Sequence, residues 1–244
     1  MTDNVPKIAV ATPSGDAVAA SEAGIGKRFT PVFHIGDDGW CVAISGVKDA
    51  PEVRHQRSPN CDARPEGSGI DLLVIHNISL PPGQFGGPFI ADLFGNSLDY
   101  DADPYFAQLR PLRVSAHFLI RRDGSVMQFV STNDRAWHAG ISAFGERQRC
   151  NDFSIGIELE GTDFEAFTVS QYQSLCAMTD ALLSRHHLMA VCGHEHIAPG
   201  RKTDPGPFFD WHRYQQGCAD TRPRALTNPT LQFPCGTYKS QMEF

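Results

Sequence analysis

The chain has 244 residues, in which 21 lysines and arginines stand against 28 aspartates and glutamates, for a formal net charge of −7. This length suits one well-filled core, and an acidic chain without a basic run is not expected to bind nucleic acid. No segment is apolar for long enough to predict a signal peptide or a membrane span. The seven cysteines are odd in number and scattered, which is typical of reduced thiols in a cytoplasmic protein.

In the first half of the chain, only one segment has a pattern that clearly predicts regular secondary structure. Residues 1–35 mix small and charged side chains without periodicity, so we expect a weakly structured extension. A domain is expected over 36–216, followed by an irregular tail over 217–244. The apolar run 71–77 lies between glycine and proline clusters and predicts a buried strand. The connection 78–104 is rich in Gly, Pro and Asp and is expected to form one wall of a cleft.

Strands and helices alternate in the second half. Further strands are predicted over residues 115–121, 126–130, 153–160 and 190–192. The sequence Arg122-Asp123-Gly124-Ser125 predicts a hairpin turn between the first two. A helix is expected over about 170–187, with Thr168 or Ser170 as its cap. Because strands and helices interleave, we predict an α/β fold with a mixed central β-sheet flanked by helices.

Residues 193–206 carry an imidazole, an ammonium and a carboxylate in a segment that proline and glycine keep out of regular structure. A catalytic zinc takes three protein ligands, among which imidazole nitrogen and carboxylate oxygen are common. His194 and Asp204 could supply two of them, and His76, at the end of the first strand, could supply the third. Each of these residues could also have a role that involves no metal. A loop rich in proline and glycine is often an ordinary surface loop, and a lone histidine at the end of an apolar strand is more often a hydrogen-bonded core residue. Neither a His-Glu-x-x-His motif nor a paired Cys-x-x-Cys motif identifies a metal here.

A family resemblance covers roughly residues 36–215. Five segments carry it in the same order along the chain, namely 74–83, 113–124, 135–140, 150–161 and 193–206. They resemble the zinc-dependent N-acetylmuramoyl-L-alanine amidases, and most of all the cytoplasmic branch that acts on 1,6-anhydro-muramyl fragments. The resemblance implies the amidase fold. It also implies hydrolysis of the amide between N-acetylmuramic acid, preferably in the 1,6-anhydro form, and L-alanine of peptidoglycan fragments in cell-wall recycling.

The resemblance also assigns roles to residues. It implies that His76, His194 and Asp204 hold one zinc ion per chain. The acidic catalytic residue of the family falls on Glu158, which we expect to act as the general base. The catalytic lysine falls on Lys202, which we expect to stabilise the oxygen that becomes negative during amide hydrolysis.

Two features of the expected site stay open at this point. Strand alternation sends Glu158 and Glu160 to the same face, so the pattern alone does not say which of them is catalytic. The resemblance implies that Asn77, Arg113 and Arg149 contact the muropeptide, and guanidinium groups suit its carboxylates. Ordinary surface pairing is the alternative for these three. The expected partner is the small-molecule muropeptide, with no nucleic acid, no membrane and no obligate protein partner.

Several other residues compete for a place in the site. Cys192 would share a strand face with His194, and thiolate is a strong zinc ligand, but the expected triad is complete without it. His117 is expected in the core or behind a ligand, and His138 near the cleft or packed on its neighbouring tryptophan. His196 stands where the family commonly has an acidic residue, which puts the local hydrogen bonding in doubt.

Two rival functions remain beside the amidase. One is a catalytically silent muropeptide-binding module on the same fold, and the other is a zinc peptidase that cuts the stem peptide. The presence of all the implied metal and catalytic residues favours an active amidase over the silent module.

Overall fold

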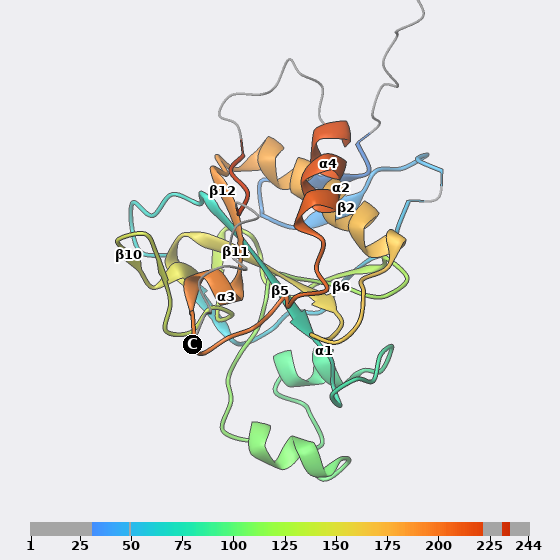
Figure 1. Ribbon diagram of the computed structural model, residues 1–244, viewed down its shortest axis with the longest axis vertical. Coiled ribbons are helices and arrows are strands. Elements are labelled where there is room, and N and C mark those ends of the chain that lie inside the picture. The colour runs from blue at the N-terminus through green and yellow to red at the C-terminus, as the bar shows by residue number, and fades with distance from the viewer. Residues whose placement is uncertain (1–30, 49, 222–230, 235–244) are drawn as a thin grey trace, which may run out of the picture.

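A computed structural model describes residues 31–48, 50–221 and 231–234 of the chain. Its centre is a six-stranded sheet with the order β12-β5-β11-β6-β7-β3 (Figure 1). The strands are β3 (Val53–His55), β5 (Leu72–Ile78), β6 (Phe118–Ile120), β7 (Val126–Gln128), β11 (Ser154–Glu160) and β12 (Ala190–Gly193). β12, β5, β11 and β6 run parallel, whereas β6 and β7 are antiparallel. The sheet is therefore mixed, as predicted.

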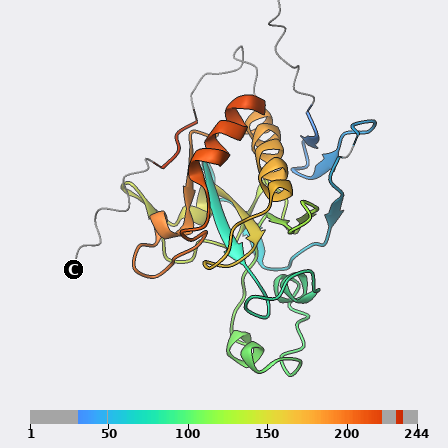
Figure 2. The ribbon, with the colours of Figure 1, turned by 45° about the vertical axis from the view of Figure 1, so that its right-hand side comes forward.

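Helices α2 (Val169–Arg185) and α4 (Trp211–Thr221) lie side by side over one face of the sheet (Figure 2). Alternate apolar residues of the central strands point to these helices and form the main core with them. Helix α2 begins with a capping box, in which the side chains of Thr168 and Gln171 each accept a hydrogen bond from the other's backbone N–H. The α/β architecture with flanking helices is confirmed.

The opposite face of the central strands is polar at its middle. Alternation places His76 of β5 there, together with Ser154, Gly156 and Glu158 of β11. All seven residues of β11 are nevertheless buried, because other segments cover this face. They are α3 (His194–Ile197), η2 (Cys150–Asp152), the hairpin of β9 (Ala143–Phe144) and β10 (Arg147–Gln148), and the pair of β4 (Cys61–Ala63) and β8 (Asp134–Ala136).

The connection after β5 forms a body of its own at one end of the sheet, drawn in green in Figure 1. It contains α1 (Phe89–Phe94) and the 3-10 helix η1 (Pro104–Leu109). Both pack into a second apolar cluster with residues from the strand β6 and the segment after β7. A short antiparallel pair, β1 (Phe33–Ile35) and β2 (Cys41–Ala43), lies against α2.

Some boundaries differ from those predicted. Residues 193–206 were expected without regular structure, yet His194–Ile197 forms one helical turn. The reason is local, because the His196 Nδ1 atom accepts the Gly193 N–H at 2.8 Å and so caps the turn. β1 lies inside the range 1–35 that was expected to be weakly structured, and α4 runs past residue 216 to Thr221. Most of both predicted extensions lies outside the described residues. Within the described ranges, no helix is long and apolar enough to cross a membrane.

Candidate metal centre

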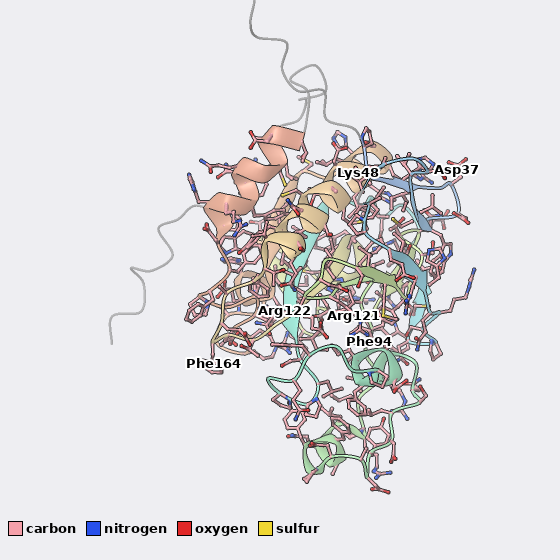
Figure 3. All side chains as sticks on the ribbon, turned by 90° about the vertical axis from the view of Figure 1, so that its right-hand side faces the viewer. Asp37, Lys48, Phe94, Arg121, Arg122 and Phe164 are labelled. Carbon is pink, nitrogen blue, oxygen red and sulfur yellow. The ribbon has the colours of Figure 1, made fainter. Side chains whose placement is uncertain are left out.

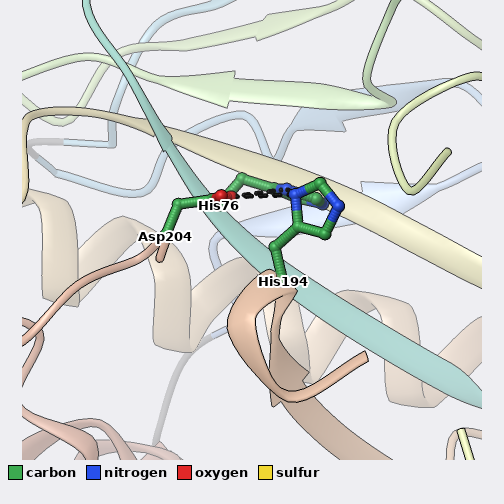
Figure 4. A group of neighbouring side chains, drawn as sticks. All are labelled: His76, His194 and Asp204. Carbon is green, nitrogen blue, oxygen red and sulfur yellow. Dashed lines mark hydrogen bonds and ion pairs between the residues drawn. The ribbon is translucent and has the colours of Figure 1, made fainter. Parts of the chain in front are cut away.

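Three side chains from distant parts of the sequence converge at the carboxyl end of β5. His76 comes from the strand itself, His194 opens α3, and Asp204 lies on the loop that follows (Figure 4). The two Nδ1 atoms are 3.0 Å apart, and Asp204 Oδ2 lies 3.0 Å from His76 Nδ1 and 3.1 Å from His194 Nδ1. The structure thus brings together the three residues for which a ligand role was predicted.

The spacing of these three atoms suits a small divalent cation. Ligand atoms about 2.0 Å from a tetrahedral zinc ion are separated by about 3.3 Å, close to the separations of 3.0 and 3.1 Å found here. His194 Nε2 lies 3.1 Å from the carbonyl oxygen of Ala139, which can only accept, so Nε2 carries the proton. With this proton retained, a neutral His194 would present the lone pair of its Nδ1 atom to a cation at the centre. A carboxylate and imidazole lone pairs so close together fit a bound cation.

The charges at this site support the same conclusion. Burial lowers the pKa of His76 to about 4, so this imidazole is neutral at pH 7. Burial alone would raise the pKa of Asp204, but hydrogen bonds with His194 and His76 hold it below its usual range. The site therefore combines one carboxylate with two nearly inaccessible imidazoles, since neither histidine is more than 3 % exposed.

The loop that carries Asp204 is fastened from two sides. The Glu195 N–H donates to the Asp204 carbonyl oxygen at 2.9 Å, and the Asn77 amide donates to the Pro205 carbonyl oxygen at 3.0 Å. Asn77 also donates to Asp163 Oδ1 at 2.7 Å. The predicted substrate residue Asn77 thus uses its amide hydrogens to hold the ligand loop in place.

Glu158 lies beside the three residues, because its position on β11 pairs with that of His76 on β5. It is 9 % exposed, and its Oε2 atom is a buried oxygen without a hydrogen-bond partner among the described residues. Burial, followed by the charge of Asp204, raises the pKa of Glu158 well above its usual value, and the ammonium of Lys202 opposes this shift. Lys202 therefore lies near enough to act on Glu158 electrostatically.

Glu160 has a different environment on the same face. It accepts hydrogen bonds from the backbone N–H groups of Gly86 and Arg122 at 2.7 and 3.2 Å, and it pairs with Arg121 at 3.1 Å. Arg121 also donates to the Gly87 carbonyl oxygen and lies where the sheet meets the α1 body (Figure 3). Glu160 is thus a buried anchor for the connection that leads from β5 to α1, and its oxygens are already occupied.

The two predicted substrate arginines lie at the surface. Arg113 is exposed and donates to the carbonyl oxygens of Leu112 and Arg110. Arg149 has a side chain that is 69 % exposed and pairs with Asp152 at 3.1 Å. Its backbone is left-handed, with φ of 62°, which is uncommon for a residue with a Cβ atom and occurs often at functional sites.

The competing residues have structural roles. His117 is fully buried; its Nδ1 atom accepts the Gly156 N–H at 3.0 Å, and it lies outside the ligand cluster. Cys192 packs in an apolar cluster, and burial raises the pKa of its thiol. His196 caps α3 and packs on Trp211.

His138 lies next to the cluster, with its Nδ1 atom 2.9 Å from His76 Nε2.

The groups behind the ligands were not predicted from the sequence. The Ala139 carbonyl oxygen accepts from both His194 and the guanidinium of Arg201, at 3.1 and 2.9 Å. The Asn151 Oδ1 atom accepts the backbone N–H groups of His138 and Ala139. A backbone carbonyl leaves no signal in a sequence, and an asparagine that binds main chain cannot be told from any other loop asparagine.

Comparisons with known proteins identify the family of this chain. The family model for N-acetylmuramoyl-L-alanine amidase matches residues 66–207. The 1,6-anhydro-N-acetylmuramyl-L-alanine amidase AmpD of Citrobacter freundii is 55% identical over 80% of this chain and 95% of its own length. AmpD of Escherichia coli K12 is 54% identical over 73% and 94%. A crystal structure of a selenomethionine AmpD derivative superposes with a TM-score of 0.68 at 53% identity, over 74% of this chain and 97% of that one. This chain belongs to the N-acetylmuramoyl-L-alanine amidase family.

Proposed function

We propose that this protein hydrolyses the amide bond between N-acetylmuramic acid and L-alanine in peptidoglycan fragments, preferably those with the 1,6-anhydro sugar. The identity of 55% to a relative named for that substrate, over 95% of the relative's length, supports this proposal. The observation that carries the chemistry is the convergence of His76, His194 and Asp204 beside the buried Glu158. The site thus combines a cation-binding cluster with an acid–base group.

In this proposal His76, His194 and Asp204 hold one zinc ion. When bound, zinc acidifies water and polarises a carbonyl group, which are the two effects that amide hydrolysis needs from a metal. The cluster is buried on one side by α3 and the sheet, so electrostatic effects there are stronger than in bulk water.

Glu158 is proposed to move the proton. Burial and the nearby carboxylate of Asp204 raise its pKa, so this carboxyl group can both take a proton from the attacking water and return it to the departing nitrogen. Lys202 is proposed to place its ammonium beside the oxygen that becomes negative as water adds. Asn77, Arg113 and Arg149 are proposed to position the muropeptide, with the two exposed guanidinium groups directed at its carboxylates.

We also propose that the protein works in the cytoplasm. The sequence has seven cysteines, and the six that the structure describes are free thiols, five of them buried. Such a set is typical of a reducing compartment. Recycled wall fragments would be the substrates met there.

The masses of the products test the proposal directly. The purified protein is incubated with a defined anhydromuropeptide, with and without a strong chelator. We expect the free anhydro sugar and the intact peptide, and a loss of both products in chelator. No products would support a silent binding module, and a shortened stem on an intact sugar would support a peptidase.

A further inference from the structure

The residues behind the two histidines of the cluster are consecutive in the sequence. His138 Nδ1 lies 2.9 Å from His76 Nε2, and the Ala139 carbonyl oxygen lies 3.1 Å from His194 Nε2. The backbone N–H groups of both residues donate to Asn151 Oδ1, at 3.2 and 2.8 Å. One short segment, fixed by one asparagine, therefore contacts the outer nitrogen of each imidazole.

The hydrogen bonds through His138 can run in only one direction if His76 is to bind a metal. His76 must then keep its Nδ1 lone pair for the centre and carry its proton on Nε2. That proton is donated to His138 Nδ1, and His138 donates its own Nε2 proton to Ser154 Oγ, 3.1 Å away. In the reverse direction the proton would lie on His76 Nδ1 and block ligation.

Gly156 makes room for the His138 ring. A Cβ atom at position 156 would lie 2.5 Å from His138 Cγ and 2.6 Å from its Nδ1 atom. The ring cannot move away freely, because Asn151 holds its main chain. A glycine inside a buried strand often marks such a close approach, and here it allows an imidazole to lie against the strand behind His76.

We propose that His138 is a positioning residue that orients His76 and fixes its tautomer for metal binding, and that Gly156 is required to seat it. This inference rests on the proposed metal site. Outer partners of metal-bound histidines keep the ring in place and make the ligand nitrogen a better donor, and their loss typically weakens metal binding about 10- to 100-fold.

Zinc affinity measured by competition with a chromophoric chelator tests the proposal with zinc alone. His138→Ala and Gly156→Ala are each expected to raise the dissociation constant about 10- to 100-fold. His138→Asn, whose side-chain oxygen takes the place of Nδ1 as an acceptor, should bind zinc within about a few-fold of the wild type. His186→Asn is the control, because it changes a partly buried imidazole that pairs with Thr132 and lies outside the ligand cluster.

A purely structural role for His138 would give a different pattern. Thermal unfolding of each metal-free variant is recorded, and only folded variants are compared. If His138→Asn loses as much affinity as His138→Ala, or if His186→Asn loses as much as His138→Ala, the positioning role is overturned. Nitrogen-15 spectra of the zinc-loaded wild type should show His138 protonated on Nε2 alone, and a proton on Nδ1 would also overturn it. Failure of the wild type to bind zinc would instead refute the metal site itself, and the positioning role with it.

Discussion

Glu158 and Glu160 show how two identical side chains on one strand face acquire different chemistry. Glu158 is buried beside the carboxylate of Asp204, and one of its oxygens is without a hydrogen-bond partner among the described residues. Glu160 is buried more deeply, at 1 % exposed, but its charge is balanced by Arg121 and by two backbone N–H groups. An unsatisfied carboxylate with a raised pKa is suited to proton transfer, whereas a fully paired one is suited to holding a loop.

Glu158→Gln is expected to retain zinc and to lower kcat by about 10²- to 10⁴-fold, because the amide cannot accept the proton of water. Steady-state kinetics on an anhydromuropeptide, together with elemental analysis, measure both effects. Glu160→Gln is the matched control. It should lower the free energy of unfolding by about 3 kcal/mol, because Arg121 loses its charged partner, while most of the turnover remains. The opposite pattern would make Glu160 the acid–base group.

Asp204→Ala is expected to weaken metal retention rather than turnover alone, since it removes the only carboxylate of the cluster and leaves the two imidazoles. Zinc content after dialysis measures the effect. Asp210→Asn, on the same loop but outside the cluster, should keep its zinc. Full zinc occupancy in Asp204→Ala would contradict the ligand role of this residue.

At the scale of elements, the sequence predicts the strands and helices that are long enough to show a regular apolar pattern. The buried strands β5 and β11 and the helix α2 are long and regular, and each lies within about two residues of its predicted limits. The strands β9 and β10 have only two residues each, too few to show any period. The single turn α3 depends on a side chain that caps its own N-terminus, in a segment whose prolines and glycines indicate a loop.

The N-terminus of α2 offers a test of one such local signal. Thr168→Ala should lower the free energy of unfolding by about 1 kcal/mol, because the N–H of Gln171 loses its acceptor. The hydroxyl also donates to the Arg122 carbonyl oxygen at 2.7 Å. Urea unfolding measures the change, and Thr168→Ser, which keeps the hydroxyl, is the control. Equal losses in the two variants would assign the effect to the methyl group instead of the cap. Zinc affinity should not change in either.

At the scale of the whole molecule, the site joins parts that the chain keeps far apart. His76 and Asp204 are separated by 128 positions and His76 and His138 by 62. The family resemblance predicted which residues meet, because motifs preserve the ligands themselves. It did not predict the contacts behind these ligands. The Ala139 carbonyl oxygen, the Asn151 side chain and the space at Gly156 come next to the ligands only when the strands and loops have assembled.

Because the centre connects β5, α3 and the loop leading to α4, metal binding should stabilise the whole fold. A ligand that binds only the folded state adds about 2.7 kcal/mol at a free concentration 100 times its dissociation constant. For a chain of this size that corresponds to a rise in Tm of about 5 to 10 °C. We expect chelator to lower the Tm of the wild type by this amount, and the shift to grow with free zinc. Asp204→Ala should start near the metal-free value and respond little. A wild-type Tm that is independent of zinc, or an equal response in Asp204→Ala, would mean that zinc does not bind the folded protein through these residues.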